Sequence, residues 1–361
     1  MAGLINGEFK PKVSKYLTEL MERVKLEQGE ESGAYRALYN QYIYSPLEAS
    51  DQKETNLKHY EAVVDSKEGL PKGIERLYRR QLVIDITMVC AAHCRYCLRA
   101  NYEVMQLSKD EIDDIVAYCA NERELKEVLV TGGDPFMVQN LLKYLISELA
   151  DKAPNIRIVR MGTRVPVQDP KKMQTDIYTF FKNYKKVLSF EVGLQVNHPI
   201  ELQPLTLEAI EALQDAGVRI YSQNVLLKNV NDDLETLIEL YDSLRYLGIE
   251  AHYLFHSIPM RGTKHLRTSV AKGLELIKRL TSSGKISGRI KPVYSLMTYV
   301  GKVTLYEGSI LHKDDEGYYH IKSYYTIDER RQWNPTYELP AEQAYLDEDG
   351  TIIAKYLDGE D

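Results

Sequence analysis

Three cysteines within eight residues are the feature of this sequence with the clearest chemistry. Cys90, Cys94 and Cys97 have the spacing C-x3-C-x2-C and follow the apolar run Leu82–Thr87. Three thiolates can bind three irons of a [4Fe–4S] cluster and leave the fourth iron open for another ligand. The remaining cysteine, Cys119, falls in a segment with helical periodicity, which favours a packing role.

An open iron can chelate the amino and carboxylate groups of S-adenosyl-L-methionine. One electron then cleaves the sulfonium and yields a 5′-deoxyadenosyl radical, which abstracts hydrogen from a substrate. Tyr96, directly before the last cysteine, fits this signature. The alternative is a structural zinc with His93 or a distant histidine as fourth ligand. Because zinc ligands are more often paired C-x2-C knuckles, the spacing favours the cluster.

The apolar and polar pattern beyond residue 80 predicts the elements that position this motif. Short apolar runs alternate there with amphipathic segments. We expect strands at Leu82–Thr87, Glu127–Thr131, Ile156–Gly162, Val187–Gln195, Arg219–Leu226, Glu250–Phe255 and Ile290–Leu296. We expect helices at Ser108–Ala120, Met137–Ala150, Pro170–Asn183, Thr206–Ala216, Asp233–Leu247 and Ser269–Thr281.

Repeated βα units predict an α/β fold, a partial (β/α) TIM-type barrel with its chemistry at the carboxyl ends of the strands. We expect three regions: a helical N-terminal wrapping region (1–80), the barrel (81–300) and a short C-terminal extension (301–361). Within the extension, Gly317–Thr326 alternates like a strand, and we expect the last residues to be frayed.

Composition limits the classes of partner. The 361 residues are 44% hydrophobic and 27% charged, without an apolar run long enough for a membrane span and without the apolar core of a signal peptide. A net charge of −7 with scattered Lys and Arg argues against a nucleic-acid partner. We therefore expect a cytoplasmic protein that acts on a small molecule.

The rim of the predicted barrel carries further candidates for cofactor binding. Gly132-Gly133-Asp134 follows the second strand and resembles the turn that radical S-adenosylmethionine enzymes place beside the cofactor's amino group, although a strand-ending Gly-Gly pair is often only a turn. Asn197 and His198 could contact the cofactor or form only a strand-ending turn with its own hydrogen bonds, and Gln223 could hydrogen-bond the adenosyl ribose or carboxylate. Arg164 is either a carboxylate anchor beside the cofactor or a charge at a helix end.

The sequence as a whole resembles the lysine 2,3-aminomutase family from about Gly73 to Gly308. The segments that carry the likeness are CAAHCRYCLR, VLVTGGDPF, IVRMGTRVPV, NHP at 197–199, SQNVLLKNVND, HLRTSVAKG and VGK at 300–302. The resemblance implies a radical aminomutase that uses pyridoxal 5′-phosphate, with Lys302 at the position of the lysine that carries it. It also implies that Arg99 binds the carboxylate of an amino-acid-like substrate, that a flavodoxin or ferredoxin supplies the electron, and that the protein forms homo-oligomers.

Several positions depart from the family pattern. Its glycine run before the lysine is reduced to Tyr299-Val300-Gly301. Its phosphate-binding arginines flank a tyrosine that matches Tyr78; here Arg76, Arg79 and Arg80 surround Tyr78, but none falls in exact register, and we take Tyr78 and Arg80 as the candidates for cofactor binding. The two aspartates that hold a lysine ammonium in the family correspond to Ile258 and a position near Ser295. An unpaired buried ammonium is costly, so we expect an amino acid other than lysine, in a pocket lined by Ile258, Met260 and Tyr294.

Two smaller observations complete the predictions. The family's C-terminal zinc cysteines have no counterpart here, which weakens the expected subunit contact. His252 and His256 alternate on one predicted strand, and we expect them to line a pocket rather than bind metal. Three functions remain open: a pyridoxal-phosphate-dependent aminomutase, a radical enzyme on the same scaffold without that cofactor (an epimerase, dehydrogenase or rearrangement enzyme), and a non-catalytic zinc-binding protein.

Overall fold

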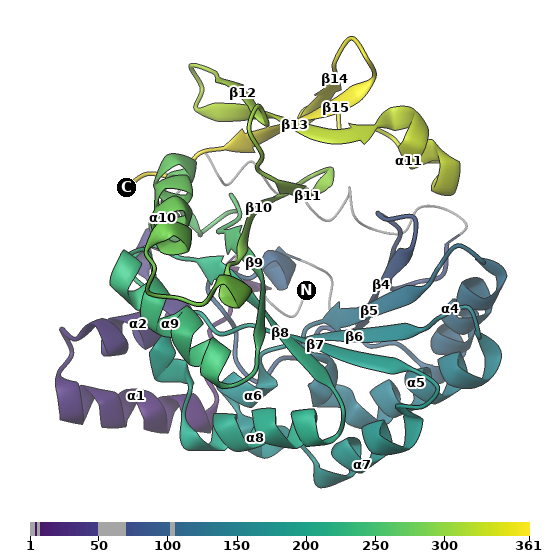
Figure 1. Ribbon diagram of the computed structural model, residues 1–361, viewed down its shortest axis with the longest axis horizontal. Helices are drawn as coiled ribbons and strands as arrows, with labels where there is room; N and C mark the ends of the chain where they lie inside the picture. Colours follow the sequence, from purple (N-terminus) through teal and green to yellow (C-terminus); the bar gives the residue numbers. More distant parts are fainter. Residues whose placement is uncertain (1–3, 6–7, 50–69, 102–104) are drawn as a thin grey trace.

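The structure is a computed structural model that describes residues 4–5, 8–49, 70–101 and 105–361. Its centre is a nine-stranded sheet in the order β11-β10-β9-β8-β7-β6-β5-β4-β3, curled into a half-barrel (Figure 1). Strands β4 to β10 are parallel to their neighbours, and the edge strands β3 and β11 are antiparallel. The strands are β3 (Ile74–Glu75), β4 (Gln81–Thr87), β5 (Glu127–Gly132), β6 (Ile158–Thr163), β7 (Ser189–Leu194), β8 (Arg219–Leu226), β9 (Glu250–His256), β10 (Val293–Thr298) and β11 (Gly301–Thr304).

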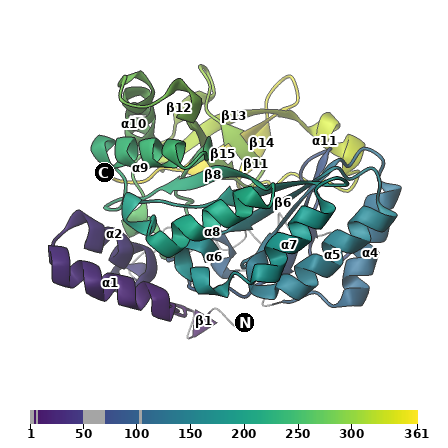
Figure 2. The same cartoon turned by 60° about the horizontal axis from the view of Figure 1, so that its bottom comes forward.

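Helices cover the convex face of this sheet, as the turned view shows (Figure 2). They are α4 (Lys109–Asn121), α5 (Gln139–Lys152), α6 (Val165–Gln168), α7 (Thr175–Tyr184), α8 (Pro204–Asp215), α9 (Leu234–Tyr246) and α10 (Val270–Ser282). Ser108 and Glu111 form the capping box that starts α4, and Asp233 caps α9. The predicted α/β partial barrel is confirmed, with small shifts at the ends of its elements. Part of the predicted helix Pro170–Asn183 is instead a short 3-10 turn, Pro170–Lys172.

Two N-terminal helices, α1 (Lys15–Gln28) and α2 (Gly33–Tyr42), pack against the cysteine loop. Their apolar faces meet Ala92 and Cys94, and the backbone N–H of Arg95 donates to the carbonyl of Gln41 at 2.8 Å. Both helices lie in the N-terminal region that the sequence predicts to be helical. A small hairpin, β1 (Leu4–Ile5) with β2 (Glu8–Phe9), precedes them, and residues 50–69 of the predicted N-terminal region lie outside the described residues.

The C-terminal residues form a second sheet, antiparallel and ordered β12-β13-β15-β14, above the open side of the half-barrel (Figure 1). Its elements are β12 (Ile310–Lys313), β13 (Tyr318–Thr326), helix α11 (Ile327–Trp333), β14 (Ala344–Leu346) and β15 (Thr351–Leu357). The expectation of a frayed end is wrong: β15 is mostly buried, and the Asp361 carboxylate caps α10 by accepting from Ser269 N at 2.9 Å.

Two contacts connect the opposite edges of the half-barrel. The Arg330 guanidinium, from α11, donates to the carbonyls of Leu77, next to β3, and of Val300, next to β11. The Tyr78 hydroxyl accepts from Lys302 N at 3.2 Å. The segments before β4 and after β10 are therefore fixed to each other although no strand pairing joins them.

In the part of the chain that the structure describes, no helix has the length and apolarity needed to cross a membrane.

Candidate active site

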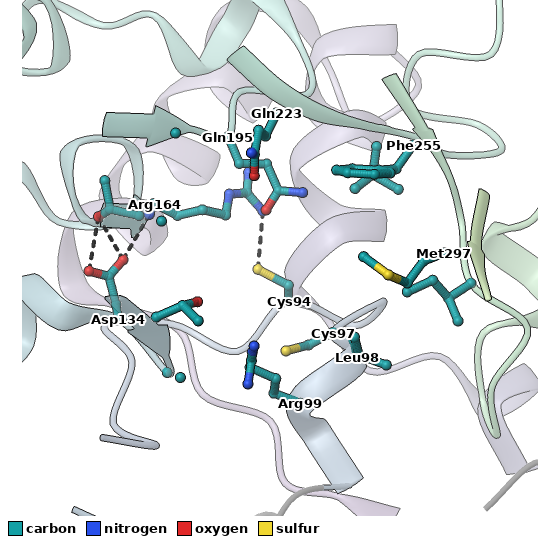
Figure 3. Close-up of a pocket in the computed structure, with 18 of the residues that line it drawn as sticks. Cys94, Cys97, Leu98, Arg99, Asp134, Arg164, Gln195, Gln223, Phe255 and Met297 are labelled. Carbon is teal, nitrogen blue, oxygen red and sulfur yellow. Dashed lines mark hydrogen bonds between the residues drawn. The ribbon is translucent and has the colours of Figure 1, made fainter. Parts of the chain in front are cut away.

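A cavity of about 340 Å³ lies inside the half-barrel and brings together most of the predicted site residues (Figure 3). It is lined by loops at the carboxyl ends of β4, β5 and β6 and by side chains of β8 to β11. Of the residues predicted from sequence, those that line it are Cys90, Cys94, Cys97, Arg99, Gly132, Gly133, Asp134, Arg164, Gln223, Tyr78 and Lys302.

The three cysteines are free thiols, and all three contribute to the wall of this one cavity. Burial raises the pKa of Cys90, and the neighbouring Cys97 raises it further, because two thiolates close together repel. Binding to iron would remove that cost, so the loop fits a cluster whose three thiolates each take a different iron. Among the described residues, no three His, Cys, Asp or Glu side chains lie in an arrangement that could hold a single metal ion. Cys119 is fully buried in α4, as predicted.

Gly132 and Gly133 are required by a close approach of two backbones. A Cβ at Gly132 would overlap the carbonyl oxygen of Thr87, and one at Gly133 would overlap that of Val89. Gly132 also has φ +115°, which side chains other than glycine rarely adopt. The glycines thus press the turn after β5 against the loop that carries the cysteines. Their contact with a cofactor stays a prediction.

Asp134 holds two rim loops together. Its carboxylate accepts from Arg164 N at 2.7 Å, from Val165 N at 3.1 Å and from the Thr163 hydroxyl at 2.8 Å (Figure 3). Burial raises the pKa of this carboxyl to about 6, against the lowering effect of these bonds. The carboxylate oxygens are engaged within the protein, so Asp134 positions the start of α6.

Arg164 lies behind the cysteine loop, and its guanidinium reaches the Cys94 sulfur at 3.1 Å (Figure 3). The same guanidinium pairs with Glu201 and donates to Gln41 Oε1 at 3.1 Å. Asn197 and His198 do not line the cavity. Asn197 Nδ2 donates to the Tyr96 hydroxyl at 2.6 Å, and His198 Nδ1 accepts from Ile200 N at 3.1 Å. Their local hydrogen bonds match the alternative that the sequence left open.

Arg99 faces the cavity and is held by two acidic side chains, Asp85 and Glu75. Burial raises the pKa of Glu75 to about 8, and Arg99 opposes that shift. Arg99 thus has a fixed position from which it can meet a substrate carboxylate, since guanidinium and carboxylate form bidentate pairs. Neither acidic residue was singled out in the sequence.

Lys302 lies on the floor of the cavity, on β11. Its ammonium is 5.4 Å from the ring centre of Tyr253 and 5.6 Å from that of Phe255. Burial lowers the pKa of Lys302 to about 8, and the nearby Arg160 lowers it further. An amine with this pKa is far more often neutral near pH 7 than an ordinary lysine, which suits a nucleophile.

Beyond Lys302 a second cavity, of about 740 Å³, extends toward the amino ends of the strands. Lys302 and Tyr78 line both cavities. The second cavity also has Arg160 and His252, whereas His256 lines the first, so the two histidines face different spaces. Arg80 is exposed and lines neither cavity, so the structure does not place it as a phosphate ligand.

One side of the main cavity is apolar: Leu98, Phe255 and Met297 face it (Figure 3), together with Ile258. Ile258 was predicted here, but Met260 and Tyr294 are buried and do not line the cavity. Tyr294 points from β10 toward Gly273 of α10, because alternate residues of a strand face opposite sides. Gln195 also lines the cavity and was not predicted from the sequence.

Comparisons with known proteins identify the family. Residues 84–241 match the model of the radical SAM superfamily. A putative L-lysine 2,3-aminomutase of Aquifex aeolicus is 31% identical over 314 residues, which cover 80% of this chain and 83% of that protein. This chain belongs to the lysine 2,3-aminomutase family of radical SAM enzymes. The family implies a [4Fe–4S] cluster, S-adenosylmethionine and aminomutase-type isomerase activity.

Further matches include a curated relative and a solved structure. Glutamate 2,3-aminomutase of Clostridioides difficile is 34% identical over 229 residues, covering 62% of this chain and 53% of that protein, so the match spans about half of that relative. A solved radical SAM methyltransferase from Sphaerobacter thermophilus is 17% identical with a TM-score of 0.45, covering 79% of this chain and 95% of that one.

Proposed function

We propose that this enzyme rearranges an amino acid with an uncharged side chain, using radical chemistry started at Cys90, Cys94 and Cys97 and pyridoxal phosphate held by Lys302. One observation carries the proposal: Lys302, a partly buried lysine with a pKa near 8, lines the same cavity as the three cysteines. The residues that would serve the two reactive centres of an aminomutase thus line one cavity.

The surroundings of Lys302 fit pyridoxal phosphate in three respects. The rings of Tyr253 and Phe255, whose centres are 4.8 Å apart, lie beside the amine and offer an aromatic surface to a planar ring. The adjoining cavity offers Arg160 and the hydroxyl-bearing Ser323 for an anionic group. Pyridoxal phosphate supplies an electron sink for the carbon centre next to an amine. The lysine must be neutral to bond to it, and its burial favours that state.

The chain's own residues then divide the work of substrate binding. Arg99, fixed by Asp85 and Glu75, meets the substrate carboxylate. Ile258, Met297 and their apolar neighbours take the side chain, and none of these side chains could pair with a cationic group, which would lose hydration against them. A low-potential one-electron donor, such as a flavodoxin or ferredoxin, is part of the proposal.

A panel of amino acids tests the proposed substrate class. Anaerobically reconstituted enzyme would receive S-adenosylmethionine, pyridoxal phosphate and a reductant, with neutral, acidic or basic L-amino acids offered one at a time. We expect formation of 5′-deoxyadenosine and of a β-amino acid isomer, both followed by mass spectrometry, with neutral substrates only. Turnover of lysine at a higher kcat/KM than every neutral amino acid would contradict the proposed class.

Two lysine variants test whether pyridoxal phosphate is bound to Lys302. Borohydride treatment should fix pyridoxal phosphate covalently to the wild-type protein and not to Lys302→Ala. Lys272→Ala is the matched control, because Lys272 lies on α10, pairs with Asp232 and lines neither of the two cavities. Equal labelling of the two variants would exclude Lys302 as the attachment point.

A second candidate is the same radical enzyme without pyridoxal phosphate, performing an epimerisation, dehydrogenation or other rearrangement. The position of Arg80 favours this second candidate. Arg80 is exposed and lines neither cavity, so it cannot serve as the arginine that binds the cofactor phosphate in the family. Substrate-dependent 5′-deoxyadenosine formation in protein free of pyridoxal phosphate would select this candidate. Replacing Arg99 with Ala should in both cases weaken substrate binding more than substrate-free cleavage of S-adenosylmethionine.

A further inference from the structure

Two side chains outside the cysteine motif donate hydrogen bonds to one of its sulfurs. Arg164 Nη1 lies 3.1 Å from Cys94 Sγ, and Gln168 Nε2 lies 3.2 Å from the same atom. They stand at the two ends of α6, Arg164 directly before its first residue and Gln168 as its last. One short helix thus directs two N–H groups at one sulfur.

The Arg164 guanidinium has little freedom to leave this position. Glu201, which is 1% exposed, pairs with it, and the Tyr42 and Tyr96 rings lie 5.2 Å and 5.8 Å from its central carbon. Gln41 of α2 also accepts from it. Because the Glu201 carboxylate balances its charge, the contribution of Arg164 at the sulfur is mainly the directed N–H bond rather than a net positive charge.

The orientation of the Gln168 amide is fixed by its other contact. Its Oε1 accepts from Ala92 N at 3.3 Å, on the cysteine loop itself, which leaves Nε2 facing Cys94. The backbone carbonyl of Gln168 accepts from Ser14, the residue that caps α1. The donor is thus anchored on both the loop and the N-terminal helices, and Gln168 is 2% exposed.

We propose that Arg164 and Gln168 are positioning residues that raise the reduction potential of the [4Fe–4S] cluster through the Cys94 sulfur. A thiolate ligand accepts stronger hydrogen bonds than a thiol, and such bonds withdraw charge from the cluster sulfur. Adding one electron makes the cluster more negative, so donors at a sulfur stabilise the reduced form more than the oxidised form. The inference depends on the family's cluster and is independent of the substrate and of pyridoxal phosphate.

Gln168 offers the cleaner variants, since it carries no charge and has no part in the Glu201 ion pair. Gln168→Leu removes the donor. Gln168→Glu keeps the size and the oxygen that faces Ala92 N, and places a carboxylate oxygen where the donor was. The matched control is Gln139→Leu: Gln139 is also a buried glutamine, but its Nε2 donates to the carbonyls of Phe136 and Lys172.

The reduction potential of the reconstituted cluster is the deciding measurement, read by electron paramagnetic resonance during a redox titration. Iron and sulfide contents, and the thermal midpoint of the apoprotein, would be measured alongside. At a fixed applied potential we expect Gln168→Leu to lower the ratio of reduced to oxidised cluster about tenfold, which is about 59 mV for one electron. Gln168→Glu should lower it further, and Gln139→Leu should leave it unchanged.

A role confined to folding would lower the thermal midpoint without moving the potential of the protein that retains its cluster. Potentials of both Gln168 variants equal to that of the wild type would therefore overturn the proposal, as would a higher potential in either. If Gln168→Leu does not retain a cluster, the Gln168→Glu titration decides alone, because that side chain preserves the contact to the loop.

Discussion

Replacing Lys302 with methionine should stabilise the apoprotein against unfolding at pH 7. Burial is the main cause that lowers the pKa of Lys302 to about 8 from the ordinary 10.5, and Arg160 adds to it. The folded protein therefore holds a charged lysine at an energetic cost. Methionine has a similar length and no charge, and it packs well against aromatic rings such as Tyr253 and Phe255.

The size of the effect follows from proton linkage. A difference of about 2.5 pKa units at about 1.36 kcal/mol per unit gives about 3 kcal/mol at pH 7. Between pH 8 and 10.5 the unfolded chain binds more protons at this lysine than the folded chain, so the free energy of unfolding of the wild type rises with pH there. The advantage of Lys302→Met should accordingly shrink to about 1 kcal/mol at pH 9.5 and vanish above pH 10.5.

Urea denaturation followed by circular dichroism can measure this difference from pH 7 to pH 9.5. The protein would be kept anaerobic, free of cluster and pyridoxal phosphate, with a thiol reductant. Lys291→Met, at an exposed lysine, provides the control for general effects of removing a charge. A gain for Lys302→Met that is the same at pH 7 and pH 9.5, or a loss at pH 7, would refute the argument that burial of the ammonium is costly.

Three further predictions concern the cysteine loop, the glycine turn packed against it, and the contacts between the barrel edges. Cys94→Ala should abolish formation of 5′-deoxyadenosine, whereas Cys119→Ser should keep the cluster; activity in Cys94→Ala would reject the cluster assignment. Gly133→Ala should lower the free energy of unfolding by about 1–3 kcal/mol and reduce iron uptake, since its Cβ would overlap Val89; an unchanged urea midpoint would contradict this. Arg330→Met leaves the buried carbonyl of Val300 without its donor, at about 1–3 kcal/mol, and also removes the donor to the partly buried carbonyl of Leu77, so it should lower the thermal midpoint; an equal or higher midpoint would show that water replaces the guanidinium.

The barrel could be predicted from sequence because its signals are local. The run 81–87 is almost wholly buried in β4, and Gly217 and Gly248 adopt positive φ where α8 and α9 end. The second sheet was mostly missed, since α11 has only seven residues and β14 only three, too short to show a period. The expectation of a frayed end failed because the burial of β15 comes from partners outside its own segment.

The site was predicted less completely, for a related reason. The cysteines and the Gly-Gly turn are contiguous motifs, so their types and spacing reveal them. The contacts of Arg164 join residues that lie 123 positions away, at Gln41, and 37 positions away, at Glu201. No spacing rule connects such residues. The predicted role of Tyr294 failed because which face of a strand meets the cavity depends on the register of the whole sheet. Met260 lies in the irregular segment after β9, where strand alternation gives no guide to the direction of a side chain.

The contacts that join the two edges of the half-barrel also bear on how this protein folds. An open sheet leaves two edge strands whose free backbone groups invite pairing with other chains. Here both edges meet the same guanidinium, Arg330, which belongs to the C-terminal sheet. These contacts can form only after residues 310–357, which follow the barrel strands in the sequence, have been synthesised and have folded. Aggregation of the nascent or truncated chain would then be governed by residues 310–357, far in sequence from the cluster that performs the chemistry.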